Sequence, residues 1–598
     1  MKVQIPGTVA SQPRDARRAT VLRTLAALSS VATLVLLAVV GMHSYYGTDE
    51  FNYAHAAWAI AQGQQPYRDF FLHHFPGSMQ LGSVVFAMWD DPRAMVGLRW
   101  LMVPFWLAAA VAITLLNRRY GPWPALLSVP LLGSLAAWVR YATQFRPDPI
   151  AISLFLLSLL LATDTGPRAR RWAFLAGICF VWAGWSSQKV VIYGVPLLVA
   201  WLAASALARV APRAPRPMNA PAQFGLGLIA GAVPIAVYLT ATDNWSHWWA
   251  WCLYGGIVHE TMYPERSPLI SLLPTLRANW YVLGLALLGA GLVLRRLSKR
   301  PVGVALADPD ALVLACAITT AVSYLMQQAP YGWSLVAPLA FVALLAARGL
   351  GELLQRALPF LDARCMRDGL VVACIVIAFA GVPFSVHSMM RTTGQRARQE
   401  SMLATVARLS APSDPVYDNT GYYVARPHAY FFFWTDQSAR LVHRDRMIRE
   451  VPDAILDGGV TMRIRDRRDR ELPPVLRSFL GDHFVCVAGD VCLWGRTYAA
   501  LGAGQASDFL AVRSADYYVS PASAAASGAL RIDGLPVRSA VFSLERGRHV
   551  VTWAGPTPVP EFSIVWLPRT GETLAPEART IAQFGIYSLP RSDLASHW

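Results

Sequence analysis

Charged residues are scarce in this chain of 598 residues. They make up 15% of the sequence, whereas hydrophobic residues make up 55%. A soluble globular domain carries about 25% charged residues, so this composition indicates a membrane protein. Several catalytic motifs are also missing, because the sequence contains no P-loop, no GxSxG, no HExxH and no paired CxxC. Their absence disfavours ATPase, serine-hydrolase and zinc-protease functions.

Cysteines are few, seven in all, and most of them suit the role of small apolar filler. Five lie in or beside apolar runs or in a basic loop: Cys179, Cys252, Cys316, Cys374 and Cys365. Cys486 and Cys492 differ, because the segment FVCVAGDVCLWG predicts a tight hairpin centred on Gly489. Symmetric pairing in that hairpin sets the two cysteines opposite each other, at a separation that a disulfide bridges. A disulfide needs an oxidising compartment, so the pair favours an extracytoplasmic C-terminal region.

Long apolar stretches fill the first two thirds of the chain. Stretches of about 17 to 25 mainly apolar residues are long enough to span a bilayer. Eleven are found, near 22–42, 94–116, 122–139, 148–163, 172–187, 190–208, 222–241, 278–295, 311–327, 332–349 and 369–388. The first follows a basic segment, but it is long for a signal-peptide core and lacks a small-residue cleavage site. We therefore expect it to be a retained helix.

The basic residues set the predicted orientation. The net charge of +16 would suit a nucleic-acid partner, but most arginines and lysines lie in short loops between apolar stretches. They occupy alternate loops, as the positive-inside rule expects of cytoplasmic segments. The remaining loops then face outward: 43–93, 140–147, 188–189, 242–277 and 328–331. An odd number of spans places the tail outside as well, which predicts a multi-pass protein of the cytoplasmic (inner) membrane with no nucleic-acid partner.

The predicted fold class is a polytopic α-helical membrane protein with an extracytoplasmic tail. Residues 1–389 form the transmembrane domain. Residues 390–497 mix helical and strand-like spacing, which predicts a small α/β unit. Residues 498–598 alternate in short strands such as DYYVS and FSIVWLP, which predicts a β-sandwich-like region. We expect the tail to be attached behind the membrane domain, where it binds glycan, docks a partner or shields the site.

One outward loop gathers many ionisable side chains. Residues 45–82 follow the first span and read YYGTDEFNYAHAAWAIAQGQQPYRDFFLHHFPGSMQLG. Their ionisable residues include Asp49, Glu50, Arg68, Asp69, His73 and His74. Ionisable groups at this depth are costly and usually mark a site or an ion pathway. The loop is therefore the first candidate for chemistry, at the outer face of the bilayer.

This loop resembles the first outward loop of the GT-C glycosyltransferases, nearest to the protein O-mannosyltransferase and aminoarabinose-transferase branch (glycosyltransferase family 39-like). That branch shows an acidic pair, a Tyr soon after, then Gly-x-x-Pro-Tyr-x-Asp and a Pro-containing turn. The matching residues are Asp49-Glu50, Tyr53, Gly63-Gln64-Gln65-Pro66-Tyr67-Arg68-Asp69 and Pro76-Gly77. Three later segments are also similar: RPDPIA at 146–151, SSQKV at 186–190 and APYGWSLVAPLAFVALLA at 329–346. One departure is His74-Phe75-Pro76, where many relatives carry Lys-Pro-Pro.

The resemblance implies inverting transfer of a sugar from a polyprenyl-phosphate donor to an extracytoplasmic acceptor, which is an envelope lipid, glycan or protein. Such a transfer needs a base for the acceptor and cations for the departing phosphate. Asp49 is the candidate base, although it also suits the first turn of a helix over 51–62. Glu50 is the second catalytic candidate, as a supporting or metal-binding group. The candidate phosphate ligands are Lys189, Arg146 and Arg68.

Other side chains are assigned to substrate binding: Tyr53, Tyr67, Asp69, His73, His74, Asp148 and Tyr331. Structural alternatives stay open, since Lys189 suits snorkelling to the interface and Arg146 suits pairing with Asp148. A divalent ion held by Asp49, Glu50 and His74 is a further alternative. Adjacent histidines in a loop form no specific ligand pattern, so the cofactor is left open.

Two rival functions remain. The first is a membrane transporter or lipid-linked sugar flippase with an accessory outer domain. Transporters place coupling charges near the middle of the membrane and show broken helices in two halves, whereas the charges here cluster in outward loops. The second is a non-catalytic relative that keeps the fold as an envelope assembly factor. Full activity or full complementation by an Asp49→Asn variant would count against catalysis.

Overall fold

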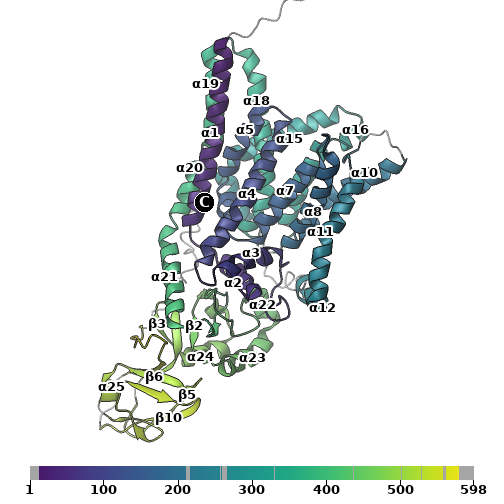
Figure 1. Cartoon of the computed structure of the whole chain (residues 1–598). Coiled ribbons are helices and arrows are strands. Elements are labelled where there is room, and N and C mark those ends of the chain that lie inside the picture. The colour runs from purple at the N-terminus through teal and green to yellow at the C-terminus, as the bar shows by residue number, and fades with distance from the viewer. Residues whose placement is uncertain are drawn as a thin grey trace, which may run out of the picture.

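Helices fill the first part of the chain, and the named strands begin at Val416 (Figure 1). The computed structural model describes residues 13–210, 216–255, 258, 265–328, 330–435, 437–499, 501–526, 528–556 and 561–577. The helical elements before the first strand are α1 (Pro13–His43), α2 (Thr48–Ala61), α3 (Gly77–Met88), α4 (Ala94–Arg118), α5 (Pro122–Gly133), α6 (Ala136–Ala142), α7 (Pro147–Ala162), α8 (Ala169–Ser186), α9 (Val190–Tyr193), α10 (Val195–Val210), α11 (Pro221–Ala241), α12 (Trp245–Trp248), η1 (Trp249–Tyr254), α14 (Leu269–Ala278), α15 (Trp280–Ser298), α16 (Val302–Leu306), α17 (Pro309–Leu325), η2 (Gly332–Leu335), α18 (Val336–Ala357), η3 (Leu358–Phe360), α19 (Arg364–Phe379), α20 (Gly381–Met390) and α21 (Thr393–Leu409).

Each of the eleven predicted apolar stretches falls on helix. Among the described residues, seven helical stretches are long and apolar enough to cross a membrane, and α5 with α6 forms an eighth if that pair, bent by 76°, is one broken span. Four shorter apolar helices, α3, α7, α14 and α17, accompany them. The predicted break at 186–189 separates α8 from α9. The polytopic helical architecture is confirmed, and the number of spans stays a prediction.

Glycines let two pairs of helices pack backbone against backbone. Gly177 of α8 faces Gly227 of α11, where an added Cβ on Gly227 would lie 2.0 Å from the carbonyl oxygen of Phe174. Gly289 of α15 meets Gly349 of α18 in the same way, since a Cβ on Gly289 would lie 2.0 Å from a carbonyl oxygen of α18. No side chain fits such contacts. Helices within membranes use small residues at their interfaces for this reason.

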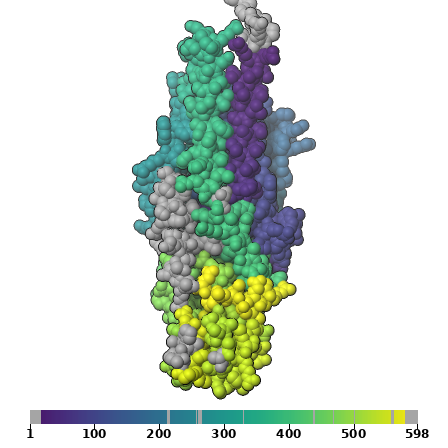
Figure 2. Space-filling model, turned by 90° about the vertical axis from the view of Figure 1, so that its left-hand side faces the viewer, coloured from purple at the N-terminus to yellow at the C-terminus, as the bar shows by residue number. Residues whose placement is uncertain are grey.

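The two ends of the helical bundle carry different features (Figure 1). The helices of the first outward loop, α2 and α3, lie at the end that faces the tail, and α16 and the start of α19 lie at the opposite end. Figure 2 shows α1 beside the later helices along one face, with the strands of the tail beyond them. The loops predicted to face outward therefore share one end with the tail. Which side of the membrane that end faces stays a prediction.

The described residues of the tail form two β-sheets. Its helical elements are α22 (Gln437–Val442), α23 (Arg444–Asp457), η4 (Arg467–Glu471), α24 (Pro474–His483) and α25 (Ser523–Ala526). Its strands are β1 (Val416–Tyr417), β2 (Met462–Ile464), β3 (Phe484–Ala488), β4 (Val491–Tyr498), β5 (Ala506–Ala511), β6 (Ala515–Ser520), β7 (Leu530–Ile532), β8 (Leu535–Pro536), β9 (Val541–Leu544), β10 (Gly547–Trp553) and β11 (Phe562–Trp566). One sheet has seven strands in the order β1-β2-β4-β11-β6-β9, with β3 also paired to β4, and the other has the order β5-β10-β7-β8.

The larger sheet joins both predicted parts of the tail. β1 and β2 pair in parallel, and β2 pairs with β4 antiparallel. β11 then continues the sheet from β4, with Val565 opposite Gly495 and Phe562 opposite Tyr498. A sheet-containing C-terminal region is confirmed. One sheet contains strands from both sides of residue 497. The division of the tail at that residue stays a prediction.

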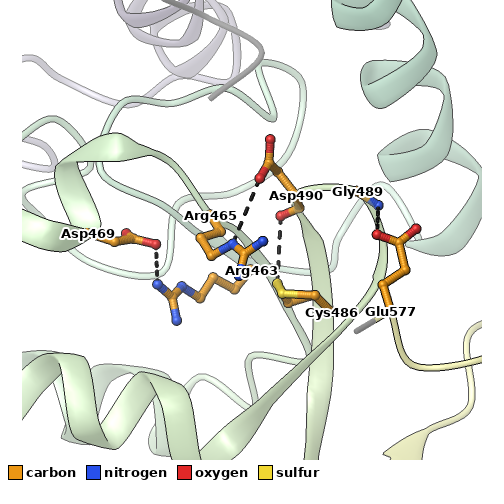
Figure 3. The surroundings of a disulfide bond; sticks show 8 residues. Arg463, Arg465, Asp469, Cys486, Gly489, Asp490 and Glu577 are labelled. Carbon is orange, nitrogen blue, oxygen red and sulfur yellow. Dashed lines mark hydrogen bonds and ion pairs between the residues drawn. A yellow bond between two sulfur atoms is a disulfide. The ribbon is translucent and has the colours of Figure 1, made fainter. Parts of the chain in front are cut away.

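The β3–β4 hairpin carries the disulfide (Figure 3). Cys486 lies opposite Cys492 in the register, and the structure joins the two by a disulfide bond. Gly489 adopts φ +58° in the turn, a conformation that glycine reaches without a Cβ penalty. The Gly489 N–H donates to Glu577 at 2.9 Å, and Arg465 forms an ion pair with Asp490 (Figure 3). The contacts with Glu577 and Arg465 thus hold the hairpin on both sides.

Candidate active site at the outer loops

Glu50 fastens the start of α2. Its two carboxylate oxygens each accept a hydrogen bond of 2.8 Å from Arg99 of α4. One oxygen also accepts from the Gly47 N–H at 3.1 Å and the other from the Phe145 N–H at 3.2 Å. The side chains of Glu50 and Arg99 are both 0% exposed. Of the two roles expected for Glu50, these contacts match the supporting one.

Asp49 lies at the edge of the same helix turn and meets a different cation. Its Oδ2 accepts a hydrogen bond of 2.7 Å from Nη2 of Arg146, the residue that precedes α7. The Asp49 side chain remains 14% exposed, whereas that of Arg146 is 3% exposed. The Arg146 guanidinium also lies over aromatic rings, 4.6 Å from Trp333 and 5.8 Å from Tyr53. Arg146 therefore pairs with Asp49, and not with Asp148 as the alternative reading had it.

A second carboxylate–cation pair lies next to the first. Asp148 is the second residue of α7, and Lys189 between α8 and α9 donates to it at 3.0 Å. Ser187 also donates to Asp148, at 3.0 Å. The Lys189 ammonium reaches further, to the Ser334 hydroxyl at 3.2 Å. The predicted residues of three separate segments thus meet, because helix ends and helix breaks bring together the first, second and third of the loops predicted to face outward.

His73 and His74 stack beside these pairs. The ring centroids of His73 and Trp434 lie 4.4 Å apart, and the His74 ring lies 5.7 Å from Tyr53. Burial lowers the pKa of His74 well below its usual value, and the charges of His73, Lys189 and Arg146 lower it further. His74 is therefore neutral at neutral pH. It does not supply the positive charge that a lysine would carry at this place.

Three predicted residues form the turn that shapes the loop. Tyr67 has φ +72° and its buried hydroxyl donates to the His74 carbonyl at 2.6 Å. Asp69 accepts from the Gln65 N–H at 2.7 Å. Arg68 pairs with Asp69 at 3.0 Å and is 45% exposed. These contacts hold the loop in shape and keep Arg68 apart from the pairs of Asp49 and Asp148.

Tyr331 is linked to Arg146 by Trp333, which contacts both residues. Its ring stacks on Trp333 with centroids 4.3 Å apart and an interplanar angle of 9°. Arg266 lies over the Tyr331 ring at 4.4 Å. Tyr331 was assigned to the site from the sequence. Trp333 and Ser334, which follow it closely, were not assigned, and neither was Arg266. Aromatic stacking thus extends the site along η2.

The tail covers α2 and contributes a residue to the site. The Phe71 N–H donates to the Phe431 carbonyl at 2.9 Å, and His55 contacts the Val424 carbonyl at 2.7 Å. His55 also contacts His428, whose pKa burial lowers to about 4. Trp434 follows in the aromatic run YFFFW at 430–434, a signal that sequence reading missed. The tail is therefore no separate attachment, because its first part packs on the loop.

Each of the residues suggested for a metal ion has another partner in the structure. Asp49 binds Arg146, Glu50 binds Arg99 and His74 packs on aromatic rings. No group of three or more His, Cys, Asp or Glu residues placed to hold a metal ion occurs in the described part of the chain.

Comparison with solved structures bears on the fold of this arrangement. ArnT from Cupriavidus metallidurans bound to undecaprenyl phosphate aligns over 81% of this chain and 98% of its own, with TM-score 0.53 and 14% identity. This chain has the ArnT fold. The apo state of ArnT aligns over 78% of this chain and 97% of its own, with TM-score 0.53 and 15% identity. The GT-C-like fold predicted from the first outward loop is thereby confirmed.

A further solved structure aligns with a lower TM-score. AglB, an oligosaccharyltransferase from Archaeoglobus fulgidus, aligns over 76% of this chain and 72% of its own, with TM-score 0.45 and 13% identity. The fold conclusion rests on the two ArnT structures, whose TM-scores exceed 0.5. No family model and no curated protein matches the sequence.

Proposed function

We propose that this chain is a membrane glycosyltransferase that moves a sugar from a polyprenyl-phosphate carrier to an envelope acceptor, with inversion at the sugar. The proposal rests chiefly on one observation: Asp49 and Asp148, each in the first turn of a helix, meet Arg146 and Lys189 at the end of the bundle that carries the outer loops. The ArnT fold supports it, because ArnT has been solved with undecaprenyl phosphate bound. A lipid-borne donor also suits a site built from loops beside membrane helices.

The reaction has a simple balance of bonds and protons. The acceptor oxygen forms a bond to the anomeric carbon of the sugar, and the bond from that carbon to the phosphate oxygen breaks. The carrier phosphate leaves with the electron pair, and the acceptor proton passes to a base. Positioned bases and cations accelerate such a transfer because they meet charge where it develops.

Asp49 suits the base, since part of its carboxylate surface is open while that of Glu50 is fully buried. Arg146 and Lys189 suit the departing phosphate. Each is a long side chain already drawn to the site by a carboxylate, and each has donors left over for an anion. Glu50 acts through Arg99, by fixing the turn from which Asp49 projects.

The outer location of the reaction is supported by the tail. The Cys486–Cys492 disulfide favours an oxidising compartment, and the tail packs directly on the loop that holds Asp49. We place the site and the tail outside the cytoplasmic membrane, where nucleotide sugars are scarce and a lipid-linked donor is available. An envelope lipid, glycan or protein is then the acceptor.

The test is sugar transfer by the purified full-length protein in proteoliposomes. Radiolabelled polyprenyl-phosphate sugars are supplied with an envelope extract, and label moving to an acceptor or to water is counted. Transfer by the wild type and its loss in Asp49→Asn would support the proposal. Lack of turnover with every donor, together with lipid movement across the vesicles, would overturn it in favour of transport.

A further inference from the structure

The described part of the chain contains seven buried arginines, and six of them have evident partners. Five meet carboxylates: Arg99 with Glu50, Arg146 with Asp49, Arg348 with Asp310, Arg440 with Glu471 and Arg463 with Asp469. The sixth, Arg426, donates to backbone carbonyls of Ala407, Ser410 and Ala425 and to the Ser410 hydroxyl. This pattern is expected, because a buried charge is costly unless it is paired or fully hydrogen-bonded.

Arg140 on α6 breaks the pattern. It is 6% exposed, and within the described residues no carboxylate lies at ion-pair distance from it. Its side chain interacts with the Tyr141 hydroxyl, while its Nη2 has no hydrogen-bond partner. A guanidinium keeps its charge in proteins and carries five N–H donors. Arg140 is therefore a buried positive charge for which the described residues supply no carboxylate partner.

The position of Arg140 connects it to the candidate site. Tyr141, its partner, has its ring 5.7 Å from the Arg146 guanidinium carbon and 6.3 Å from the Trp333 ring. Two arginines thus approach the same tyrosine. Further N–H donors around Arg146 also lack partners, namely Arg146 Nε and Trp434 Nε1. The Trp434 ring lies 6.4 Å from the Tyr53 ring, and the Arg146 guanidinium lies 5.8 Å from the same Tyr53 ring.

The charge balance of the site points to an anion. Asp49 offsets Arg146 and Asp148 offsets Lys189, so these two pairs are neutral. Arg140 adds one positive charge that no carboxylate in the described ranges offsets. Buried unpaired donors beside an uncompensated cation are the features of a site completed by a bound anion, and Arg is suited to phosphate because its planar fork binds two oxygens.

We propose that Arg140 binds the phosphate of the substrate and that this phosphate supplies the negative charge that Arg140 lacks. The inference deepens the proposed function and rests on it for the lipid part of the ligand. The recognised chemistry is a phosphate anion, which a polyprenyl-phosphate carrier or free phosphate both provide. Arg140 takes the place among the phosphate ligands that Arg68, turned toward Asp69, does not occupy.

The experiment measures binding to the full-length protein in nanodiscs. Undecaprenyl phosphate, neutral undecaprenol and inorganic phosphate are titrated separately, with tryptophan fluorescence for affinity and thermal unfolding as a second readout. We expect Arg140→Gln to weaken undecaprenyl phosphate binding at least ten-fold, which equals about 1.4 kcal/mol, and to leave undecaprenol binding unchanged. Arg140→Lys keeps the charge and should lose less affinity.

Two control variants separate binding from folding. Arg93→Gln removes one outer-loop charge from an exposed pair and should change neither affinity nor unfolding temperature. Arg426→Gln removes a buried arginine that the backbone holds, and should lower the unfolding temperature without changing affinity. Arg140→Gln should leave the ligand-free unfolding temperature equal or higher, because it removes an unpaired buried charge, while the rise produced by undecaprenyl phosphate is lost.

Each outcome decides a separate point. Equal binding of undecaprenyl phosphate by wild type and Arg140→Gln would overturn the role of Arg140 and leave the proposed function standing. Binding of inorganic phosphate through Arg140 without lipid binding would support the anion site and overturn the lipid donor. A wild type that binds neither phosphate would overturn both.

Discussion

The two ends of the helical bundle each hold a cluster of buried charges, and the clusters are built differently. At the end opposite the tail, Asp310 meets both Arg348 and Arg296, and Asp308 meets both Arg296 and Arg300. Each carboxylate there has at least two cations, and the network ties α15, α17 and α18 together. At the end next to the tail, Asp49 and Asp148 each have one cation, and Asp49 stays partly exposed.

The two clusters suit different roles: one holds helices together, and the other suits the binding of a ligand. In the cluster opposite the tail, three arginines share two carboxylates, so both carboxylates are fully engaged. The pairs at the tail end each have one cation, and near them lies Arg140, which has no carboxylate partner among the described residues. Loss of one partner from a buried charge network is strongly destabilising, whereas a partly exposed pair beside further donors suits a reaction in which charge moves. Four predictions test this contrast, beginning with the largest expected effect.

Removal of the candidate base should abolish most activity with little loss of fold. We expect Asp49→Asn to reduce sugar transfer about 1,000-fold, within the range that positioned general bases contribute. The measurement is initial rate per folded molecule in proteoliposomes. Asp91→Asn, in an exposed pair of the same outward segment, is the control and should keep full rate. Normal transfer by Asp49→Asn would place the base elsewhere.

Removal of a carboxylate from the cluster opposite the tail should lower the stability of the fold more than the transfer activity. Asp310→Asn leaves the buried Arg348 without its carboxylate and should lower the free energy of unfolding by about 3 kcal/mol. Unfolding by dodecyl sulfate in mixed micelles, followed by tryptophan fluorescence, measures the loss. Glu352→Gln, in an exposed pair with Arg356, should change it by less than about 0.5 kcal/mol. A drop in transfer rate without a drop in stability would contradict the structural role.

Lys189 should matter for the phosphate more than for the fold. Lys189→Ala removes a cation that is 25% exposed and paired with Asp148. We expect roughly 100-fold lower kcat/KM for the lipid donor, equal to about 2.7 kcal/mol of transition-state stabilisation. Kinetics at varied donor concentration measure it. If the lysine serves only to reach the membrane interface, Lys189→Arg and Lys189→Ala will both retain activity.

The disulfide should give the smallest effect, confined to the tail. Replacing Cys486 and Cys492 by serine removes a cross-link of one hairpin and should cost about 2 kcal/mol of tail stability. Limited proteolysis of the tail at rising temperature detects the change. Transfer activity at low temperature should stay the same, because the hairpin lies outside the segment 422–434 that covers the site. A strong loss of activity at low temperature would show that the hairpin reaches the site.

Local features explain what was predictable. The length of apolar stretches identifies membrane helices, and the acidic pair Asp49-Glu50 signals a helix start, because both depend on residues close in sequence. The Cys486–Cys492 hairpin is local in the same sense. The division of labour between Asp49 and Glu50 was not predictable, since it depends on Arg99 and Arg146, which lie in other segments.

Several members of the site were hidden because their roles are set by distant neighbours. Arg68 and Arg140 look alike in sequence, yet one turns to Asp69 and the other is buried with no carboxylate partner in the part of the chain that the structure describes. Trp434 comes from the tail and meets His73, some 360 positions earlier in the chain.

By itself the sequence determined the class of molecule, the apolar helices, the loop at 45–82 that is rich in ionisable groups and the cysteine hairpin. These follow from hydrophobic length and from capping, which act over a few residues or one helix. The tertiary structure alone decided which cation meets which carboxylate, which arginine stays unpaired and where the tail covers α2. Those choices depend on helix packing, because ion pairs form between whichever groups the packed backbone brings within hydrogen-bond reach.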